Sequence, residues 1–191
     1  MSKGEVRQAG TKARQSLDTR GRARLSGIVA GRVVRLPEYA KAQTIACYVS
    51  TEDEVGTEAV ILDALESGKV VAVPRVGRHG ALSFHSVGSA RELSPGAFGI
   101  MEPNEDSPVV SLSETQMVVV PVVAWDESGN RVGRGGGYYD RALREREGSF
   151  AVGLAFESQR AAAVPSTQLD APLDAVVTET RTLRFGRAEH A

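Results

Sequence analysis

Apolar residues near the start of the chain recur at the spacing of one helix face. Residues 2–16 and 19–36 are rich in helix-forming residues, and the second stretch has apolar residues at positions 25, 28, 29, 33 and 36. Pro37 follows, and proline cannot continue a helix interior. This pattern predicts two helices, the second of which ends before Pro37.

The pattern then changes to short apolar runs, which are typical of buried strands. Residues 44–50 (TIACYVS) and 69–76 (KVVAVPRV) form two such runs. Between them, residues 57–68 (TEAVILDALESG) have helical spacing, with Thr57 as the expected N-cap and Gly68 at the end. The order strand, helix, strand favours a parallel crossover, and therefore an α/β layered fold.

Four further segments complete the expected strands. Residues 81–87 alternate between apolar and polar and predict a half-exposed strand, while residues 149–156 and 174–179 are apolar. Residues 117–125 (MVVVPVVAW) also predict a strand, in which Pro121 indicates an edge or a bulge. Residues 94–113 are polar and proline-containing, which is typical of a loop.

Composition bounds the class of protein. The 191 residues are 41% hydrophobic with a formal net charge of −1, which predicts one soluble globular domain spanning residues 1–191 and a cytoplasmic location. No apolar run reaches the roughly 20 residues of a membrane helix, and no signal sequence is expected. We therefore expect no membrane partner.

Positive charge gathers in the first 41 residues, which hold ten cations and three anions. Tyr39 is the only aromatic residue there, whereas nucleic-acid binding would favour interleaved aromatic residues. We therefore expect a solvated helix face and no nucleic-acid partner. Cys47 is the only cysteine and is expected to be a buried apolar residue, and no role is assigned to His79, His85 or His190.

Residues 130–143 (NRVGRGGGYYDRAL) hold the candidate chemistry. Glycines let backbone amides approach a ligand closely, and Arg134, Arg141 and Asp140 beside them fit a phosphate with bridging magnesium. The spacing matches neither the P-loop nor the dinucleotide-binding fingerprint. A flexible loop without a ligand remains an alternative. In an open α/β sheet this loop, which follows residues 117–125, would lie where ligands bind.

The longer segment DESGNRVGRGGGYYDRAL, residues 126–143, resembles the signature of the 5-formyltetrahydrofolate cyclo-ligase family, also called methenyltetrahydrofolate synthetase. Other segments are similar to that family in the same order: SKGEVR, CYVSTEDEVGTEAVI, FGIMEP and LDAPLDAVVTE. The resemblance implies a single layered α/β domain with a mostly parallel central sheet flanked by helices, of the NagB/RpiA/CoA-transferase-like type. It also implies ATP-dependent closure of 5-formyltetrahydrofolate to 5,10-methenyltetrahydrofolate through a phosphorylated formyl group, with Mg²⁺ as cofactor. We predict a monomeric or weakly associated enzyme, and folates with and without a polyglutamate tail both stay open as substrates.

The resemblance also implies roles for individual residues. Those expected to bind ATP are Lys3, Arg7, Gly133, Arg134, Gly135, Gly136, Gly137, Tyr138, Tyr139, Asp140 and Arg141. Those expected to bind the folate are Val49, Glu54, Phe98, Gly135, Gly136, Gly137, Tyr138 and Tyr139. Arg134 and Tyr139 are the expected catalytic residues, and Asp140 and Asp174 the expected magnesium ligands.

Two departures from the family pattern limit this transfer. Gly136 stands where some members have lysine, and Leu169 stands where histidine is common before Asp170. Two alternatives stay open: a paralogue without ring-closing activity, and a non-catalytic folate or nucleotide binder. A sugar-phosphate isomerase of similar architecture is less favoured because it would need neither two magnesium carboxylates nor the tyrosine pair.

Overall fold

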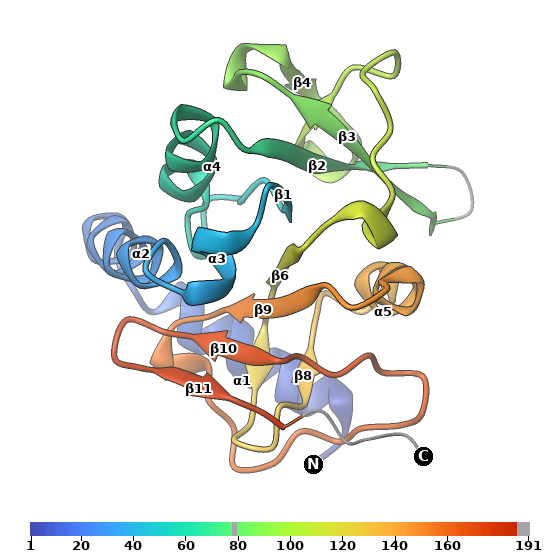
Figure 1. Cartoon of the computed structure of the whole chain (residues 1–191). Coiled ribbons are helices and arrows are strands. Elements are labelled where there is room, and N and C mark those ends of the chain that lie inside the picture. The colour runs from blue at the N-terminus through green and yellow to red at the C-terminus, as the bar shows by residue number, and fades with distance from the viewer. Residues whose placement is uncertain (78–79, 187–191) are drawn as a thin grey trace.

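The computed structural model describes residues 1–77 and 80–186, and its centre is a twisted sheet (Figure 1). Within these residues the sheet has seven strands, in the order β11 (Thr182–Arg184), β10 (Ala175–Val177), β9 (Phe150–Leu154), β6 (Met117–Pro121), β1 (Thr44–Cys47), β2 (Val70–Val76) and β3 (Leu82–Val87). The five inner strands are parallel, and the edge strands β3 and β11 are antiparallel to their neighbours. The expectation of a mostly parallel α/β sheet is confirmed.

Helices flank this sheet. The α-helices are α1 (Lys3–Gln15), α2 (Thr19–Val33), α3 (Pro37–Lys41), α4 (Glu58–Glu66) and α5 (Tyr138–Ala142). Two small antiparallel pairs are added, β4 (Leu93–Pro95) with β5 (Met101–Pro103), and β7 (Ala124–Trp125) with β8 (Arg131–Val132). Among the described residues, none of the helices has the length and apolar character required to cross a membrane.

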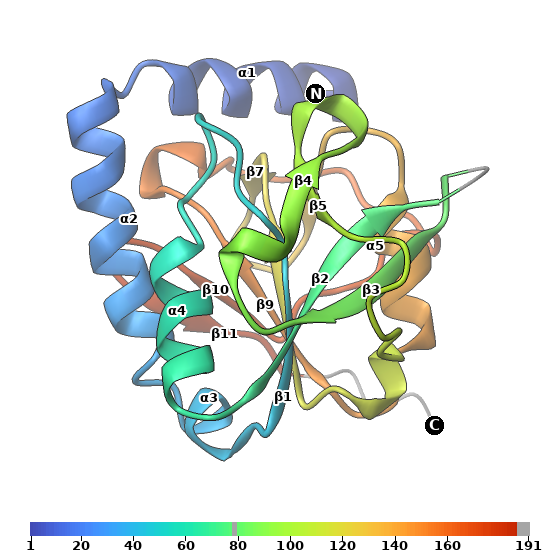
Figure 2. The same ribbon diagram turned by 90° about the horizontal axis from the view of Figure 1, so that it is seen from above.

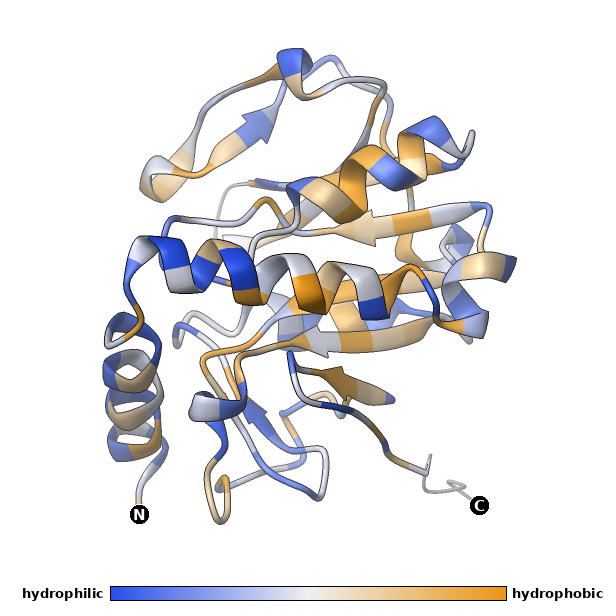
Figure 3. Ribbon diagram, turned by 90° about the vertical axis from the view of Figure 1, so that its left-hand side faces the viewer, coloured by the Kyte–Doolittle hydropathy of each residue, from blue (hydrophilic) through white to orange (hydrophobic). Residues whose placement is uncertain are grey.

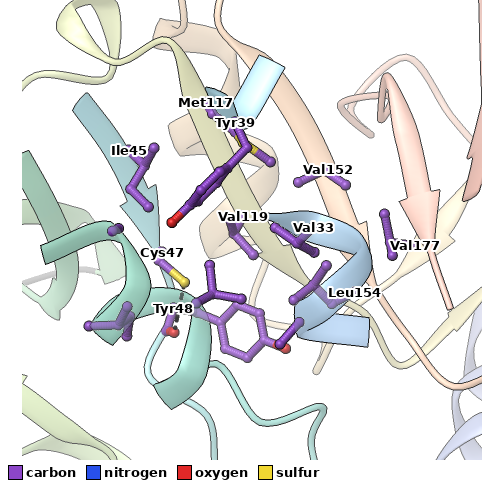
Figure 4. Packing of buried hydrophobic residues seen from close by; sticks show 14 of the residues in the cluster. Val33, Tyr39, Ile45, Cys47, Tyr48, Met117, Val119, Val152, Leu154 and Val177 are labelled. Carbon is purple, nitrogen blue, oxygen red and sulfur yellow. Dashed lines mark hydrogen bonds between the residues drawn. The ribbon is translucent and has the colours of Figure 1, made fainter. Parts of the chain in front are cut away.

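Two apolar layers form the core, one on each face of the sheet. Along β1, Ile45 and Cys47 face the layer that also contains α2 and α4, whereas Ala46 faces the layer on the side of α5. Figure 4 shows the first layer, where Cys47 and Val119 lie among aliphatic and tyrosine side chains. Both faces are covered, so the inner strands β1, β6, β9 and β10 consist almost entirely of apolar residues, and the centre of the sheet is largely orange or pale in Figure 3. Cys47 is fully buried, as expected, and burial raises the pKa of its thiol.

Helix α1 lies across one end of the sheet, and α2 descends along its side (Figure 2). A capping box between Ser2 and Glu5 begins α1, and Val6 packs in a small cluster with Ala124 and Val132. Gly10 allows a close approach, because a Cβ atom there would lie 2.3 Å from the carbonyl oxygen of Val123. The basic first helix is therefore fixed against the chain that follows β6.

Several local expectations need correction. Pro37 does not only end a helix, because it is also the first residue of α3, where its missing N–H is not needed. Thr57 makes no side-chain cap, since its hydroxyl donates to the carbonyl of Tyr48 at 2.7 Å. The run 117–125 breaks after Pro121, which ends a central strand opposite Leu154 and does not lie at an edge.

The chain order creates a crevice at the carboxyl ends of the strands. From β1 the chain passes through α4 to β2 on one side, whereas from the adjacent β6 it passes through α5 to β9 on the other side. Such a topological switch point is where ligands bind in open α/β sheets. The segments that follow β1 and β6 are residues 48–57 and 122–137, so both predicted site regions lie at this point.

Candidate functional site

A pocket of about 850 Å³ opens at this switch point. Its walls come from the start of α1, the loop after β1, the end of β2 and the start of β3, the β4–β5 hairpin, the end of β6, strand β8, the glycine loop with α5, and residues 167–170. All the expected site residues except Asp174 line it, namely Lys3, Arg7, Val49, Glu54, Phe98, Gly133, Arg134, Gly135, Gly136, Gly137, Tyr138, Tyr139, Asp140 and Arg141. Residues up to 167 positions apart in the sequence thus share one pocket.

Backbone conformation explains the glycine loop. Gly135 and Gly137 have φ angles of 107° and 66°, in the region that disfavours other residues. Gly136 has a different reason to lack a side chain, since a Cβ atom there would lie 2.4 Å from the ring of Tyr138. The glycine found where some family members have lysine therefore fits the position of this tyrosine.

Helix α1 supports the loop directly. The Nε atom of Arg7 donates a hydrogen bond to the carbonyl oxygen of Gly133 at 2.8 Å, and its guanidinium lies against Gly135. Arg141, on α5, donates to the carbonyl of Gly80 at 2.6 Å and lies over the ring of Tyr138. Arg7 thus holds the start of the loop, and Arg141 joins helix α5, which follows the loop, to the connection between β2 and β3.

Three ion pairs face the pocket. Lys3 Nζ lies 2.6 Å from Asp170 Oδ1, Arg131 Nη2 lies 2.9 Å from Asp140 Oδ1, and Arg134 Nη2 lies 3.1 Å from Glu54 Oε1. Each pair joins a cation that could bind phosphate to a carboxylate that could bind metal or substrate. In each of these pairs the two charges neutralise one another in direct contact at the wall of the pocket.

Glu54 is the most buried of these carboxylates at 7% exposure. Its Oε2 atom accepts from the amide of Thr51 at 3.0 Å, while Oε1 accepts from Nε of Arg134 at 3.2 Å. Arg134 also donates to the hydroxyl of Thr51 at 2.6 Å, although 45% of its side chain is exposed. An exposed arginine thus covers a buried carboxylate at the mouth of the pocket.

Tyr139 lies between the two core layers. Its hydroxyl is buried without a hydrogen-bond partner among the described residues, and its ring packs edge-on against Phe84. Burial raises the pKa of this phenol well above its ordinary value, and the nearby Cys47 and Glu54 act in the same direction. Tyr139 therefore stays protonated and can donate a hydrogen bond, but it cannot act as a base near neutral pH.

Phe98 lies at the tip of the β4–β5 hairpin and is 71% exposed. It is the one residue other than glycine with a positive φ angle, 58°, in the described part of the chain. Its ring meets that of Tyr138 edge-on, with centroids 6.4 Å apart. The buried carboxylate of Glu102 fixes the hairpin by accepting from the amides of Val76 and Ala97. An apolar ring is thus held over the pocket.

Asp174 requires a correction, because the structure does not bring it to this pocket. It precedes β10, so it lies at the amino end of a parallel strand, whereas the pocket lies at the carboxyl ends. Its carboxylate accepts from Arg146 at 2.8 Å and from the amide of Ala151 at 2.7 Å. The aspartate that does reach the pocket is Asp170, and the next residue, Ala171, donates its amide to Asp140 at 3.2 Å.

The environment of Asp170 keeps it charged. Burial acts to raise its pKa, but hydrogen bonds from Lys3 and from the amide and hydroxyl of Thr167 outweigh burial, and the pKa is lowered. Asp140 and Asp170 are both partly buried, at 22% and 18% side-chain exposure. Within the described residues, no three Asp, Glu, His or Cys side chains gather closely enough to hold a metal by themselves.

Sequence reasoning missed two further arginines. Arg131 lies beneath the glycine loop, only 3% of its side chain is exposed, and it pairs with Asp140. Arg14 lies at the far end of α1 and pairs with Asp53. Arg131 stands within the quoted loop motif, so the motif itself was a signal, whereas nothing local marks Arg14. His85 is buried between Ser83 and the carbonyl of Ser107, away from the pocket, and His79 and His190 lie outside the described residues.

The sequence of this chain is similar to those of known proteins. A model of the 5-formyltetrahydrofolate cyclo-ligase family matches residues 1–179. The 5-formyltetrahydrofolate cyclo-ligase of Escherichia coli K12 is 34% identical over 157 residues, covering 80% of this chain and 86% of that protein. The Haemophilus influenzae protein of the same name is 33% identical over 146 residues, covering 73% and 78%.

A solved structure agrees. The NMR structure of Aquifex aeolicus 5,10-methenyltetrahydrofolate synthetase superimposes with a TM-score of 0.86 at 32% identity, covering 100% of both chains. The similarity thus extends over the sheet, the helices and the segments that form the pocket.

Proposed function

The chain belongs to the 5-formyltetrahydrofolate cyclo-ligase family, and from this premise we propose how its pocket performs the reaction. It is an ATP-using ligase of folate one-carbon metabolism that closes 5-formyltetrahydrofolate to 5,10-methenyltetrahydrofolate and releases ADP and phosphate. The observation that carries the assignment of the site is the convergence of the glycine loop, the cations Lys3 and Arg7 and the carboxylate Glu54 on one pocket.

The chemistry explains why such a pocket is needed. A formamide oxygen is a poor leaving group, so it first attacks the γ-phosphorus of ATP and ADP departs. The neighbouring folate nitrogen then attacks the activated formyl carbon, phosphate leaves with the oxygen, and the proton of that nitrogen is carried off by the phosphate. Charge develops on phosphoryl oxygens throughout, and such reactions are catalysed mainly by positioning and electrostatic stabilisation.

The nucleotide side is formed by α1 and the glycine loop. Lys3 and Arg7 are four residues apart on one helix face, so both reach the same ligand. The bare backbone from Gly133 to Gly137 lets phosphate oxygens approach the amides closely. Arg7, which binds the carbonyl of Gly133, also keeps the loop in place.

Arg134 is the residue that changes partner. It is exposed enough to move, and its guanidinium covers Glu54. When a nucleotide binds, its terminal phosphate offers a more highly charged partner, and bidentate guanidinium contacts with phosphate are strong. Arg134 then stabilises the transferring phosphoryl group, and Glu54 is released to accept hydrogen bonds from the pterin ring.

Apart from the carboxylate of Glu54, the part of the pocket that would bind the folate offers uncharged contacts. Val49 and Phe98 supply apolar surface, and the ring of Phe98 can stack on a flat heterocycle. The unpartnered hydroxyl of Tyr139 is available to donate a hydrogen bond. Because the pKa of Tyr139 is raised, this donor persists across the neutral range.

Magnesium would be held by Asp140 and Asp170 together with phosphate oxygens. Magnesium commonly takes one or two carboxylates and keeps several waters, so two carboxylates without a third protein ligand fit its preferences. When bound, the ion supplies positive charge to the phosphoryl oxygens. Arg131 and Lys3 provide countercharge for the two aspartates in its absence.

The test is product formation by the purified protein. With ATP, Mg²⁺ and 5-formyltetrahydrofolate, we expect the absorbance of methenyltetrahydrofolate to rise together with release of ADP and phosphate, and no rise without ATP. A non-catalytic binder would bind both ligands in calorimetry and release no phosphate. A paralogue would release phosphate with another acceptor only. Either result would overturn the proposed activity.

A further inference from the structure

One face of α1 carries more of the site than its first turn. Lys3, Arg7, Gly10 and Arg14 recur at the spacing of a single helix face. Lys3 and Arg7 line the pocket, and Gly10 lets the helix lie against Val123. Arg14 is last in this row, and it faces the loop that carries Glu54.

Arg14 is buried, which is unusual for an arginine. Only 5% of its side chain is exposed, and Nη2 lies 2.6 Å from Oδ2 of Asp53. Its Nη1 atom lies 3.9 Å from Oε1 of Glu54 and has no hydrogen bond among the described residues. The guanidinium therefore holds one acidic residue firmly and stands beside the next one.

Glu54 thus lies between two arginines of different character. Arg134 reaches it from solvent with a side chain that is 45% exposed, whereas Arg14 reaches it from inside the protein. If Arg134 leaves for a phosphate, Glu54 keeps one cation nearby. A buried carboxylate without such a partner is costly, and it would tend to move toward solvent.

We propose that Arg14 is a positioning residue of the reaction, which ties the Asp53–Glu54 segment to α1 and keeps Glu54 in place for the folate while Arg134 serves the nucleotide. This inference rests on the proposed function, and it deepens it by assigning the two arginines to different ligands. Helix α1 then supports both substrates, the nucleotide at its first turn and the folate at its last.

The pair with Asp53 supports this division. Burial acts to raise the pKa of Asp53, but the charge and hydrogen bond of Arg14 outweigh burial and lower it. Asp53 also accepts from the hydroxyl of Thr51, whose amide binds Glu54. Asp53 therefore links Arg14 to the turn from which Glu54 projects.

The experiment compares Arg14→Met with Lys12→Met, since Lys12 is an exposed cation on the same helix. We expect Arg14→Met to raise the KM for 5-formyltetrahydrofolate about tenfold and to change the KM for ATP less than twofold, because contacting residues typically couple by an amount equivalent to such a factor. Lys12→Met should change neither. Arg14→Lys should recover part of the loss.

Other outcomes would contradict the inference. Equal changes in both KM values would show that Arg14 has only a structural role. The same conclusion would follow if the melting temperature fell while both KM values, measured well below that temperature, stayed unchanged. If Arg14→Met does not fold, Asp53→Asn and Arg14→Lys take its place, and no folate-specific effect in either would also overturn the inference.

A second measurement separates this inference from the proposed activity. Calorimetric binding of 5-formyltetrahydrofolate, with a non-hydrolysable ATP analogue present, needs no turnover. We expect about tenfold weaker binding for Arg14→Met than for Lys12→Met. If the wild-type protein binds the folate but forms no product, the proposed function fails, and this comparison still decides the role of Arg14.

Discussion

Ion pairs at the two ends of the sheet look alike and differ in what surrounds them. At the amino end, Arg146 pairs with Asp174, whose carboxylate also accepts the amide of Ala151 in β9. At the carboxyl end, Arg134 pairs with Glu54 above a pocket of about 850 Å³. The first pair joins one loop to a strand, and Asp174 lines a separate pocket of about 470 Å³ that contains none of the glycine-loop or α1 residues. The second pair closes over space that a ligand can fill.

This difference shows that the role of an ion pair, in stability or in catalysis, depends on what surrounds it. Arg146 and Asp174 are both largely buried, with 13% and 6% of their side chains exposed. Arg134 is 45% exposed and can leave its partner without breaking the core. We therefore expect changes at the amino end to act on stability and changes at the carboxyl end to act on catalysis.

Replacing Arg134 should have the largest effect. We expect Arg134→Gln to lower kcat by about two to three orders of magnitude, because it removes a preorganised cation from the phosphoryl group. Steady-state kinetics at saturating ATP measure this. The matched control is Arg160→Gln, whose side chain is 49% exposed and pairs with Glu127 away from the pocket. A kcat within tenfold of the wild-type value for Arg134→Gln would contradict the role.

Replacing Asp174 and Asp170, each in a separate variant, tests the comparison directly. We expect Asp174→Asn to lower the free energy of unfolding by about 2 kcal/mol, because it removes one partner of a largely buried ion pair, and to leave both KM values unchanged. Asp170→Asn should do the reverse, raising the KM for MgATP with a stability change below about 1 kcal/mol. Urea denaturation and kinetics on both variants measure this. Loss of magnesium-dependent activity in folded Asp174→Asn would break the comparison.

Asp140 gives a smaller effect on metal use. We expect Asp140→Asn to raise the Mg²⁺ concentration needed for half-maximal activity about tenfold, because a neutral amide is a weaker ligand for a hard cation. A magnesium titration at fixed ATP measures it, and a thermal melt checks the fold. Asp106→Asn, in an exposed loop, is the control. An unchanged titration would remove Asp140 from the metal site.

The smallest expected effect is on the free energy of unfolding at acidic pH. The lowered pKa of Asp170 means that its ion pair with Lys3 contributes stability fully above the ordinary carboxyl pKa of about 4 and loses that contribution as the pH falls through the lower folded value. In Lys3→Met the main partner is gone and the folded pKa rises, so this loss should be smaller and should end at a higher pH. We expect a difference below about 1 kcal/mol between urea curves recorded from pH 3 to 6. Identical pH profiles would contradict this account of Asp170.

Much of the architecture could be predicted, because the spacing of apolar residues along the chain distinguishes helices from strands and is read from the local sequence. The helices containing Val33 and Val60 and the buried strands with Ile45 and Val119 follow from spacing alone. The break after Pro121 could not be predicted, because it depends on the β7–β8 hairpin that follows and packs against α1. Residues 117–125 would be equally apolar if they formed one long strand or a short strand followed by a buried hairpin, so the sequence pattern does not separate the two.

The site could be predicted only in part. The glycine motif and the resemblance around it pointed to residues that do line the pocket, including Glu54, which otherwise looks like a loop charge. The choice between Asp170 and Asp174 could not be made from sequence, because both stand in the same short segment and only the strand direction separates them. Arg14 was missed for a related reason: its partner is 39 positions away.

A structure with a non-hydrolysable ATP analogue and Mg²⁺ tests the central claim most directly, namely that Arg134 exchanges Glu54 for phosphate. We predict that the terminal phosphate lies against the glycine loop within hydrogen-bond distance of Arg134, that the Arg134–Glu54 pair is open, and that Arg14 still lies beside Glu54. Phosphates bound elsewhere, with Arg134 still paired to Glu54, would contradict the account.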